Sequence, residues 1–353
     1  MFGLPIADLA ANEERGRIVP PEATRYPDSA TELQVVRLTS PGNMAALPPA
    51  SLRPVARHTQ FLLYASDRGG SMQAWRMDLK SGESRQLTGA AALDPATLAL
   101  SPDERSFFFF DGPSLRRSYF SGLHEAEVYR AAESSSRSDF ALTEDGMYAA
   151  FVEKAGAGSK LQLLNILSRQ VSVLATHSSG LSRPLFRPRR AQVMYRADGA
   201  LWLVDFTGQN KRKLRTIDGG ELGPARWTPH GRTIVYLHYP GEHQLNTIRE
   251  ITPDEQRSDK LIAKTSQFVQ LGINGDASVF VGASRNAGSP YILLLLRVNQ
   301  RELSLCEHHS SDPSAVNPMF SPDSQRIYFQ SDRDGKQAIY AIRVEKFVEE
   351  TDG

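Results

Sequence analysis

A motif that recurs along the whole chain limits the possible folds most strongly. A short apolar strand, a turn built on Pro-Asp or a similar pair, and a second apolar strand follow one another in segments 98–110, 226–236 and 319–329. Weaker copies are centred on positions 56, 144, 188 and 274, so successive turns lie 41 to 48 residues apart. Repeats of this length with strand character are typical of four-stranded blades.

Seven such units predict an all-β protein, a seven-bladed β-propeller whose blades are four-stranded antiparallel sheets. The last unit supplies only three strands, whereas segment 33–39 has strand character and no blade of its own. We therefore expect this N-terminal strand to close the last blade and to cover a sheet edge. The predicted organisation is an N-terminal extension (1–30), a single seven-bladed propeller (31–347) and a C-terminal tail (348–353).

Composition excludes several classes of function. The 41 Lys and Arg residues balance 40 Asp and Glu residues, which argues against nucleic-acid binding because phosphate contacts need a surplus of positive charge. The single cysteine, Cys306, excludes an intrachain disulfide and fits a reducing compartment. The longest apolar run, 291–296, is too short to cross a bilayer, and the first residues lack the pattern of a signal peptide. We expect a cytoplasmic protein with no nucleic-acid and no membrane partner.

Two known families resemble this repeat. TolB-type propellers share the pattern of Ser66-Asp67-Arg68-Gly69-Gly70 and of Phe320-Ser321-Pro322-Asp323. The oligogalacturonate lyase family is similar over nearly the whole chain. Its opening strand resembles 26–41, its first blade resembles 78–88, and Trp227-Thr228-Pro229 and the last blade follow in order. This second resemblance implies a cytoplasmic seven-bladed propeller that cleaves short pectin fragments by β-elimination.

The resemblance also implies a divalent metal, Mn²⁺, which is held mainly by histidines and neutralises the uronate carboxylate while a basic side chain takes the proton. This sequence departs from that pattern. The family's last-blade His-Pro-His falls at Ala315-Val316-Asn317, a Gln upstream of it falls at Asp312, and a further metal histidine falls near Gln270. We therefore expect no cofactor, and Mn²⁺ only if the lyase interpretation holds. The weak candidate ligands are then Gln270, His308, His309 and Asp312.

The innermost strands of a propeller converge on its axis, where ligands bind. The position five residues before each turn begins such a strand, and it is polar in most units. In chain order these positions are Ser51, Thr97, Asp139, Arg183, Pro224, Val269 and Asn317, with Gln270 in place of Val269 if the register slips by one residue. Period two adds Arg187 to the face of Arg183, and Arg226 to that of Pro224.

The candidate substrate-binding residues are Asp139, Arg183, Arg187, Arg226, Gln270 and Asn317. Arg183 and Arg226 would lie opposite Asp139 at one mouth of the channel. One interpretation is an anion pocket in which guanidinium groups bind a carboxylate, and the other is a channel filled by internal ion pairs. No catalytic residue can be assigned.

Three hypotheses about function follow. The first is a lyase-like propeller without the metal-dependent site that binds acidic oligosaccharides. The second is an active lyase with a relocated site, in which an Arg, Lys or Tyr base acts and arginine replaces the metal. The third is a TolB-like propeller whose partner is another protein. The fold alone does not decide between them.

Overall fold

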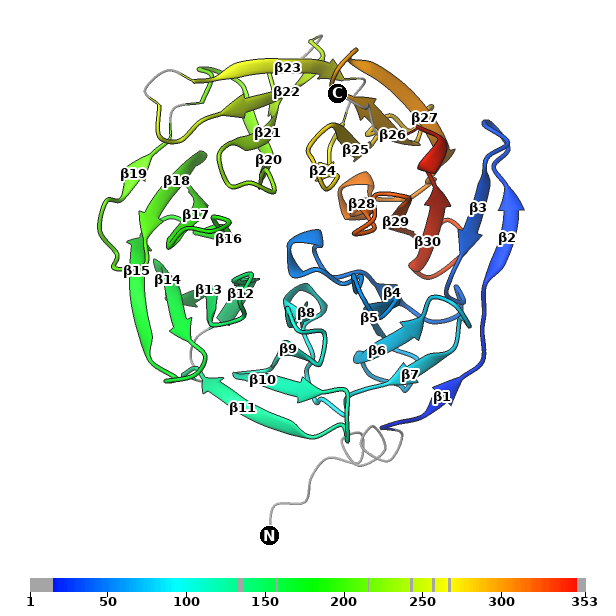
Figure 1. The fold of residues 1–353 in the computed structure, drawn as a ribbon, viewed down its shortest axis with the longest axis horizontal. Coiled ribbons are helices and arrows are strands. Elements are labelled where there is room, and N and C mark those ends of the chain that lie inside the picture. Colours follow the sequence, from blue (N-terminus) through cyan, green and yellow to red (C-terminus); the bar gives the residue numbers. More distant parts are fainter. Residues whose placement is uncertain are drawn as a thin grey trace. The chain divides into compact units, whose positions relative to one another are not determined.

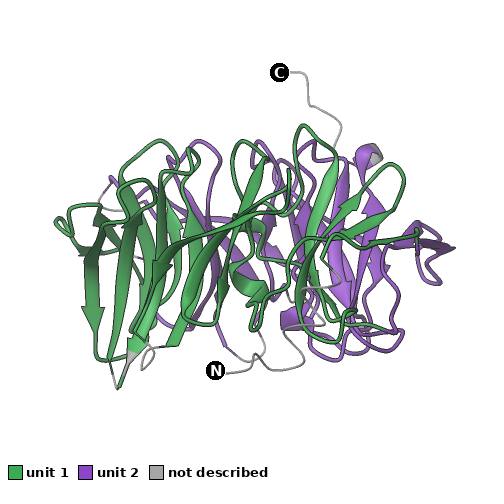
Figure 2. Ribbon diagram, turned by 90° about the horizontal axis from the view of Figure 1, so that it is seen from below, with its two compact units in different colours: residues 1–21, 43–214 green, residues 22–42, 215–353 purple. Residues whose placement is uncertain are grey.

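The structure is a computed structural model, which describes residues 15–132, 136–156, 158–214, 216–241, 244–255, 258–265 and 268–347. Its strands form seven antiparallel sheets that follow one another along the chain (Figure 1). The chain divides into two compact units, residues 1–21 with 43–214 and residues 22–42 with 215–353 (Figure 2). The seven sheets are the blades of an all-β seven-bladed propeller, as predicted from the repeat.

Unit 1 contains four blades, each named by its place in the chain. Blade 1 contains β1 (Ile18–Val19), β4 (Ala45–Ala46), β5 (Phe61–Ser66), β6 (Gln73–Asp78) and β7 (Ser84–Gln86), and blade 2 contains β8 (Ala99–Leu100), β9 (Ser106–Asp111), β10 (Ser114–Tyr119) and β11 (Glu125–Arg130). Blade 3 contains β12 (Ser136–Leu142), β13 (Tyr148–Ala155), β14 (Gly158–Asn165) and β15 (Val171–His177). Blade 4 contains β16 (Ser182–Phe186), β17 (Gln192–Ala197), β18 (Ala200–Asp205) and β19 (Arg212–Lys213). Two 3₁₀ helices, η1 (Ala50–Leu52) and η2 (Pro95–Thr97), precede the inner strands of blades 1 and 2.

Unit 2 contains the other three blades. Blade 5 contains β20 (Glu221–Trp227), β21 (Ile234–Tyr239), β22 (Asn246–Ile251) and β23 (Lys260–Thr265). Blade 6 contains β24 (Gly272–Ile273), β25 (Val279–Ala283), β26 (Tyr291–Leu296) and β27 (Arg301–Glu307). Blade 7 contains β2 (Thr24–Pro27), β3 (Gln34–Arg37), β28 (Met319–Phe320), β29 (Arg326–Ser331) and β30 (Ala338–Arg343). The 3₁₀ helix η3 (Pro313–Ala315) leads into blade 7, and η4 (Glu345–Phe347) follows it.

The shape of the repeated turn depends on a hydroxyl side chain that both donates and accepts a hydrogen bond. In blade 2 the hydroxyl of Ser101 donates to Asp103 over 2.5 Å and accepts from the backbone N–H of Ser106 over 3.1 Å. In blade 3 the hydroxyl of Thr143 does the same with Asp145 and Tyr148. Such local bonds provide hydrogen-bond partners for the backbone groups of a tight turn. Because the partner is a side chain of the motif itself, the turn could be predicted from the sequence.

The predicted closure of blade 7 is confirmed, because β3 pairs antiparallel with β30 from the other end of the chain. The segment before β3 also forms strands. β1 pairs with β7 at the edge of blade 1, and β2 pairs with β3 at the edge of blade 7, so two sheet edges are covered. Residues 1–14 of the predicted extension and the predicted tail, 348–353, lie outside the described residues.

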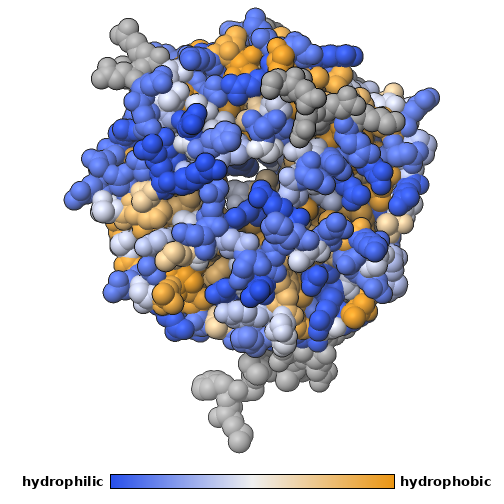
Figure 3. Space-filling view, in the orientation of Figure 1, coloured by the Kyte–Doolittle hydropathy of each residue, from blue (hydrophilic) through white to orange (hydrophobic). Residues whose placement is uncertain are grey.

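Within each unit the core lies between neighbouring blades. Phe107, Phe108, Phe109 and Phe110 of β9 are all at most 2% exposed, so both faces of this strand are buried. The face shown in Figure 3 is mainly hydrophilic, with separate hydrophobic patches. No helix within the described ranges is long and apolar enough to cross a membrane. The cytoplasmic location stays a prediction.

Candidate functional site

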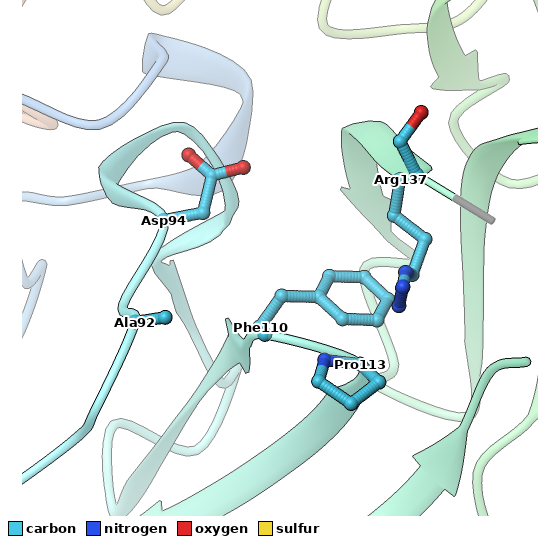
Figure 4. A pocket seen from close by; sticks show the side chains of 7 residues that line it. Ala92, Asp94, Phe110, Pro113 and Arg137 are labelled. Atoms are coloured by element: carbon cyan, nitrogen blue, oxygen red, sulfur yellow. The ribbon is translucent and has the colours of Figure 1, made fainter. Parts of the chain in front are cut away.

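A cavity of about 430 Å³ lies in unit 1 between blades 2 and 3. Its lining combines an acidic, a basic and an aromatic side chain with small residues (Figure 4). We call it the Arg137 cleft, and its lining residues are Ala92, Asp94, Phe110, Gly112, Pro113, Ser136 and Arg137. All of them lie at the end of the blades where the connection from the preceding blade arrives, which we call the connection end. Loops at one end of a rigid blade scaffold are common places for binding residues.

Asp94 is positioned by the connection that leads into blade 2. Its carboxylate caps η2 by accepting the backbone N–H of Ala96 over 2.9 Å, and Pro95 occupies the first helical position. The hydroxyl of Thr97 donates to the Asp94 carbonyl and accepts from the N–H of Phe110. These bonds tie the connection to β9, so Asp94 is held at a fixed place on the wall of the cleft.

Arg137, the second residue of the inner strand of blade 3, lies across the cleft from Asp94, and its guanidinium group lies beside the Phe110 ring (Figure 4). Its guanidinium carbon lies 6.0 Å from the centroid of the Phe110 ring, at the outer limit of a cation–π contact. The Phe110 ring itself is held edge-on against Phe151. The aromatic ring is therefore a fixed floor between a cationic and an acidic wall.

Burial raises the pKa of Asp94 above its ordinary value. The Ala96 N–H works against this shift, whereas the negative charge of Asp139 adds to it. The carboxyl group of Asp94 thus sits in a place where its charge is disfavoured, and perturbed carboxyls of this kind are frequent at functional sites.

Asp139 and Arg183 lie next to one another on neighbouring blades. The backbone N–H of Arg183 donates to the Asp139 carboxylate over 3.1 Å, and the Arg183 side chain is exposed. The prediction that Arg183 stands opposite Asp139 is therefore wrong. Arg226 belongs to unit 2 and is partly buried, with Nη1 3.5 Å from the carbonyl of Ala225.

Backbone strain marks these positions. Asp139 and Arg183 have φ angles of 55° and 53°, in the left-handed region that residues with a Cβ rarely adopt. Arg53, which ends η1 in blade 1, also has a left-handed φ of 55°, and its guanidinium donates to the carbonyl of Thr143 over 3.1 Å. Burial lowers the pKa of Arg53. Strained residues held at one end of a scaffold are candidates for a functional role.

The period-two prediction for Arg187 fails because the inner strand is not regular. The register of β16 shifts between Ser182 and Leu185, so Arg183 sits in a β-bulge. Arg187 lies at the other end of this strand, is 4% exposed, and donates from Nη1 to Gln192 over 2.9 Å. Arg183 and Arg187 therefore belong to different ends of blade 4.

The same irregularity recurs in two other blades. β12 shifts register between Ser138 and Ala141, and β20 shifts between Leu222 and Ala225. Three predicted inner positions, Asp139, Arg183 and Pro224, thus coincide with bulges. A bulge breaks the alternation of faces, so the argument that placed Arg226 with Pro224 loses its basis as well.

In unit 2 the remaining candidates gather around η3. The side-chain amide of Gln270 donates to the carbonyl of Ser314, and the Asp312 carboxylate caps η3 by accepting from the N–H and the hydroxyl of Ser314 at 2.8 and 2.6 Å. Asn317 follows η3 with a left-handed φ of 48°. These side chains shape the connection into blade 7.

Both ring nitrogens of His308 form hydrogen bonds to the backbone. Nδ1 accepts the backbone N–H of Ser310 over 3.0 Å, so Nε2 carries the proton that is donated to the carbonyl of Ser284 over 3.1 Å. The ring is fully buried, and burial lowers the pKa of His308. His309 is exposed, and its Nε2 lies 3.0 Å from the carboxylate of Glu307.

The candidate ligands do not fit a divalent metal. Among the described residues, no three His, Cys, Asp or Glu side chains gather around a common point. His308 offers no lone pair, and Asp312 and Gln270 bond to the same serine of η3. We derive no chemical step through a metal from this arrangement.

Asp94 and Arg137 are not among the site residues predicted from the sequence. Arg137 stands two residues before Asp139 on the same strand, and Asp94 precedes a proline in the pattern of a helix cap. These two sequence signals are visible, but the cleft is formed by different positions of two neighbouring blades. A comparison of repeats aligns only equivalent positions, so it does not bring these residues together.

Comparisons with known proteins agree with the fold. No family model matches the chain. An oligogalacturonide lyase of Pectobacterium atrosepticum is 22% identical and covers 94% of this chain and 98% of its own length. An oligogalacturonate lyase of Dickeya dadantii is 21% identical and covers 90% and 95%.

Two solved structures are similar as well. An oligogalacturonate lyase in complex with manganese superposes with a TM-score of 0.88 at 22% identity, over 94% of this chain and 98% of that one. An oligogalacturonate lyase from Vibrio parahaemolyticus has a TM-score of 0.86 at the same identity and coverage. The chain is therefore similar in sequence to oligogalacturonate lyases over nearly its whole length, and it has a seven-bladed β-propeller fold.

Proposed function

We propose that this protein binds acidic oligosaccharides of the oligogalacturonide type in the Arg137 cleft. The observation that carries the proposal is the placement of a guanidinium group and a carboxyl group on opposite walls of one cavity, with an aromatic floor between them (Figure 4). A uronic acid ring offers an apolar face, hydroxyl groups and a carboxylate, which match these three features.

Each wall has a chemical task. Arg137 presents a planar fork of donors that suits a carboxylate, and Phe110 and Pro113 suit the apolar face of a sugar ring. Asp94 accepts hydrogen bonds from hydroxyl groups. The exposed Arg183, on the next blade at the same end, is a second cation for the carboxylate of a neighbouring sugar unit.

The similar lyases support this ligand class, because their names refer to oligogalacturonides. The test is calorimetry with trigalacturonate and the neutral trigalactose. We expect Arg137→Ala to weaken trigalacturonate binding at least tenfold, about 1.4 kcal/mol, and Arg183→Ala to weaken it less. Arg105→Ala removes an exposed arginine at the other end of blade 2 and serves as the matched control. Equal binding of the two trisaccharides would refute the proposal.

A second candidate is a lyase reaction in the same cleft, favoured by the half-buried carboxyl of Asp94 across the cleft from Arg137. A base would remove the proton next to the uronate carboxylate, a carbon–carbon double bond would form, and the bond to the leaving sugar oxygen would break as that oxygen takes up a proton from water. Arg137 would balance the charge that develops on the carboxylate. The unsaturated product absorbs ultraviolet light, so its formation with and without Mn²⁺ separates binding alone, metal-free elimination and metal-dependent elimination. A protein-binding role stays a prediction.

A further inference from the structure

A second cavity, of about 690 Å³, lies at the other end of blade 4. It is formed by the β16–β17 turn and the segment after β18. We call it the Arg189 pocket, and its lining residues are Arg189, Arg190, Ala191, Gln192, Asp205, Phe206 and Thr207. Because β16 has five residues, this pocket is separated from Arg183 by roughly 15 Å along the strand. It is therefore a different place from the connection end.

One wall of the pocket is a chain of paired polar groups. Arg187 donates to Gln192 over 2.9 Å, Gln192 donates to Asp205 over 2.8 Å, and Asn210 donates to the other oxygen of Asp205 over 2.6 Å. The bonds from Asn210 and Gln192 lower the pKa of Asp205, so its carboxylate is ionised at neutral pH. This wall is rigid, and the Asp205 carboxylate is its negatively charged group at the pocket.

The turn above it carries two arginines. Arg189 has a left-handed φ of 59°, and the N–H of Arg190 donates to the carbonyl of Arg187 over 3.3 Å, so the turn backbone is defined. Both residues are exposed at the pocket. Within the described part of the chain, neither guanidinium group has a hydrogen bond or an ion pair. Two adjacent cations without partners attract an anionic group.

The third element is an aromatic wall. Phe206 is half-buried, and its ring packs against Tyr148 at 5.1 Å and against Phe186 at 5.4 Å between centroids. These contacts hold the ring in place at the pocket, where its exposed part offers a flat apolar surface. Aromatic surfaces of this kind suit the face of a sugar or another ring.

We propose that the Arg189 pocket binds a polyhydroxylated ring that carries a carboxylate or a phosphate. The anionic group faces Arg189 and Arg190, the ring lies against Phe206, and its hydroxyl groups face Asp205 and Thr207. The negative charge of Asp205 disfavours ligands with anionic groups at both ends. The site takes its ligand independently of the Arg137 cleft, since the two share no residue.

The test is calorimetry on the Arg137→Ala variant, in which binding in the Arg137 cleft is weakened. The probes are galacturonate, glucose 6-phosphate and inorganic phosphate. We expect at least one of the two ring-bearing anions to bind tenfold more tightly than inorganic phosphate, and the better of them identifies the anionic group. The further change Arg189→Ala with Arg190→Ala should weaken that binding at least tenfold.

Arg169→Ala is the matched control, because Arg169 is an exposed arginine with a left-handed φ of 59° on a turn at the same end of blade 3. It should change the affinity less than twofold. Phe206→Leu should weaken the binding of the ring-bearing anion and leave inorganic phosphate unaffected. If neither ring-bearing anion binds, or if Arg169→Ala weakens binding as much as the double variant, the proposal is wrong. A failure of the trigalacturonate experiment leaves this one unaffected.

Discussion

The backbone N–H of Arg183 donates a 3.1 Å hydrogen bond to the carboxylate of Asp139, and both residues have left-handed backbones. This bond joins the bulge of one inner strand to the bulge of the next. It uses the Asp139 side chain to hold a strained segment of the neighbouring blade, while the Arg183 side chain stays exposed. The backbone conformation at this end of unit 1 is thus held by a bond to the N–H of Arg183, and the side chain of Arg183 stays available to a ligand.

Replacing Arg183 with glycine should separate stability from binding. Glycine adopts a φ of 53° without a steric cost, so Arg183→Gly should stabilise the protein by about 1 kcal/mol, whereas Arg183→Ala keeps the strain. Both variants should bind trigalacturonate more weakly, because both lack the guanidinium group. Urea unfolding and calorimetry measure the two effects. Equal stability of the glycine and alanine variants would contradict the assigned strain.

The sequence predicted the blades and the closing strand because most of the turns carry their own hydrogen-bonding side chain, as Ser101 and Thr143 do. Counting back from these turns located Asp139 and Arg183 at strained positions. The positions of Arg187 and Arg226 could not be predicted in the same way. A bulge inserts one residue and reverses the faces that follow, and the sequence carries no clear signal for it.

Glu104 should contribute a pH-dependent stabilisation. Burial alone would raise its pKa, but the Thr59 hydroxyl and the N–H groups of Arg57, His58 and Thr59 donate to the carboxylate, and these bonds hold the pKa below its ordinary value. The stabilisation is therefore present above the unfolded-state pKa of about 4.3 and is lost as the pH falls through the lower folded-state value.

The variant Glu104→Gln should unfold about 1 kcal/mol more easily than the wild type at pH 7, and this difference should vanish in acid. Urea unfolding at several pH values measures it. Glu83→Gln, at an exposed carboxylate of blade 1, is the control and should show no such trend. A difference for Glu104→Gln that is independent of pH would refute the role of the charge.

Asp94 has two roles that substitutions can separate. Asparagine keeps the cap on η2 and removes the charge, whereas alanine removes both. Since burial raises the pKa of Asp94, its ionised form is disfavoured in the folded state at neutral pH. We expect Asp94→Asn to be at least as stable as the wild type at pH 7, and Asp94→Ala to lose about 1 kcal/mol. Thermal unfolding of the two variants checks this, and a more stable alanine variant would exclude the capping role.

His308 should make the protein sensitive to acid. Burial lowers its pKa, with further lowering by the positive charges of His309 and Arg333. The unfolded chain therefore binds a proton near pH 6.5 that the folded chain takes up only at lower pH, so stability falls as the pH drops from 7 towards 5. His308→Asn keeps an acceptor for the N–H of Ser310 and should show a smaller slope over this range. An unchanged slope would assign the acid sensitivity to other groups.

Manganese should leave the stability of this protein unchanged, although a similar structure is a manganese complex. Both nitrogens of His308 are bonded to the backbone, and Asp312 caps η3. A site whose Kd lies a hundredfold below the metal concentration would add about 2.7 kcal/mol to the free energy of unfolding. We therefore expect 1 mM Mn²⁺, roughly a hundredfold above the Kd of a site that binds the metal at about 10 μM, to shift Tm no more than Mg²⁺ does. A larger shift that disappears in Asp312→Ala would show that η3 rearranges to bind the metal, and would favour the metal-dependent lyase reaction.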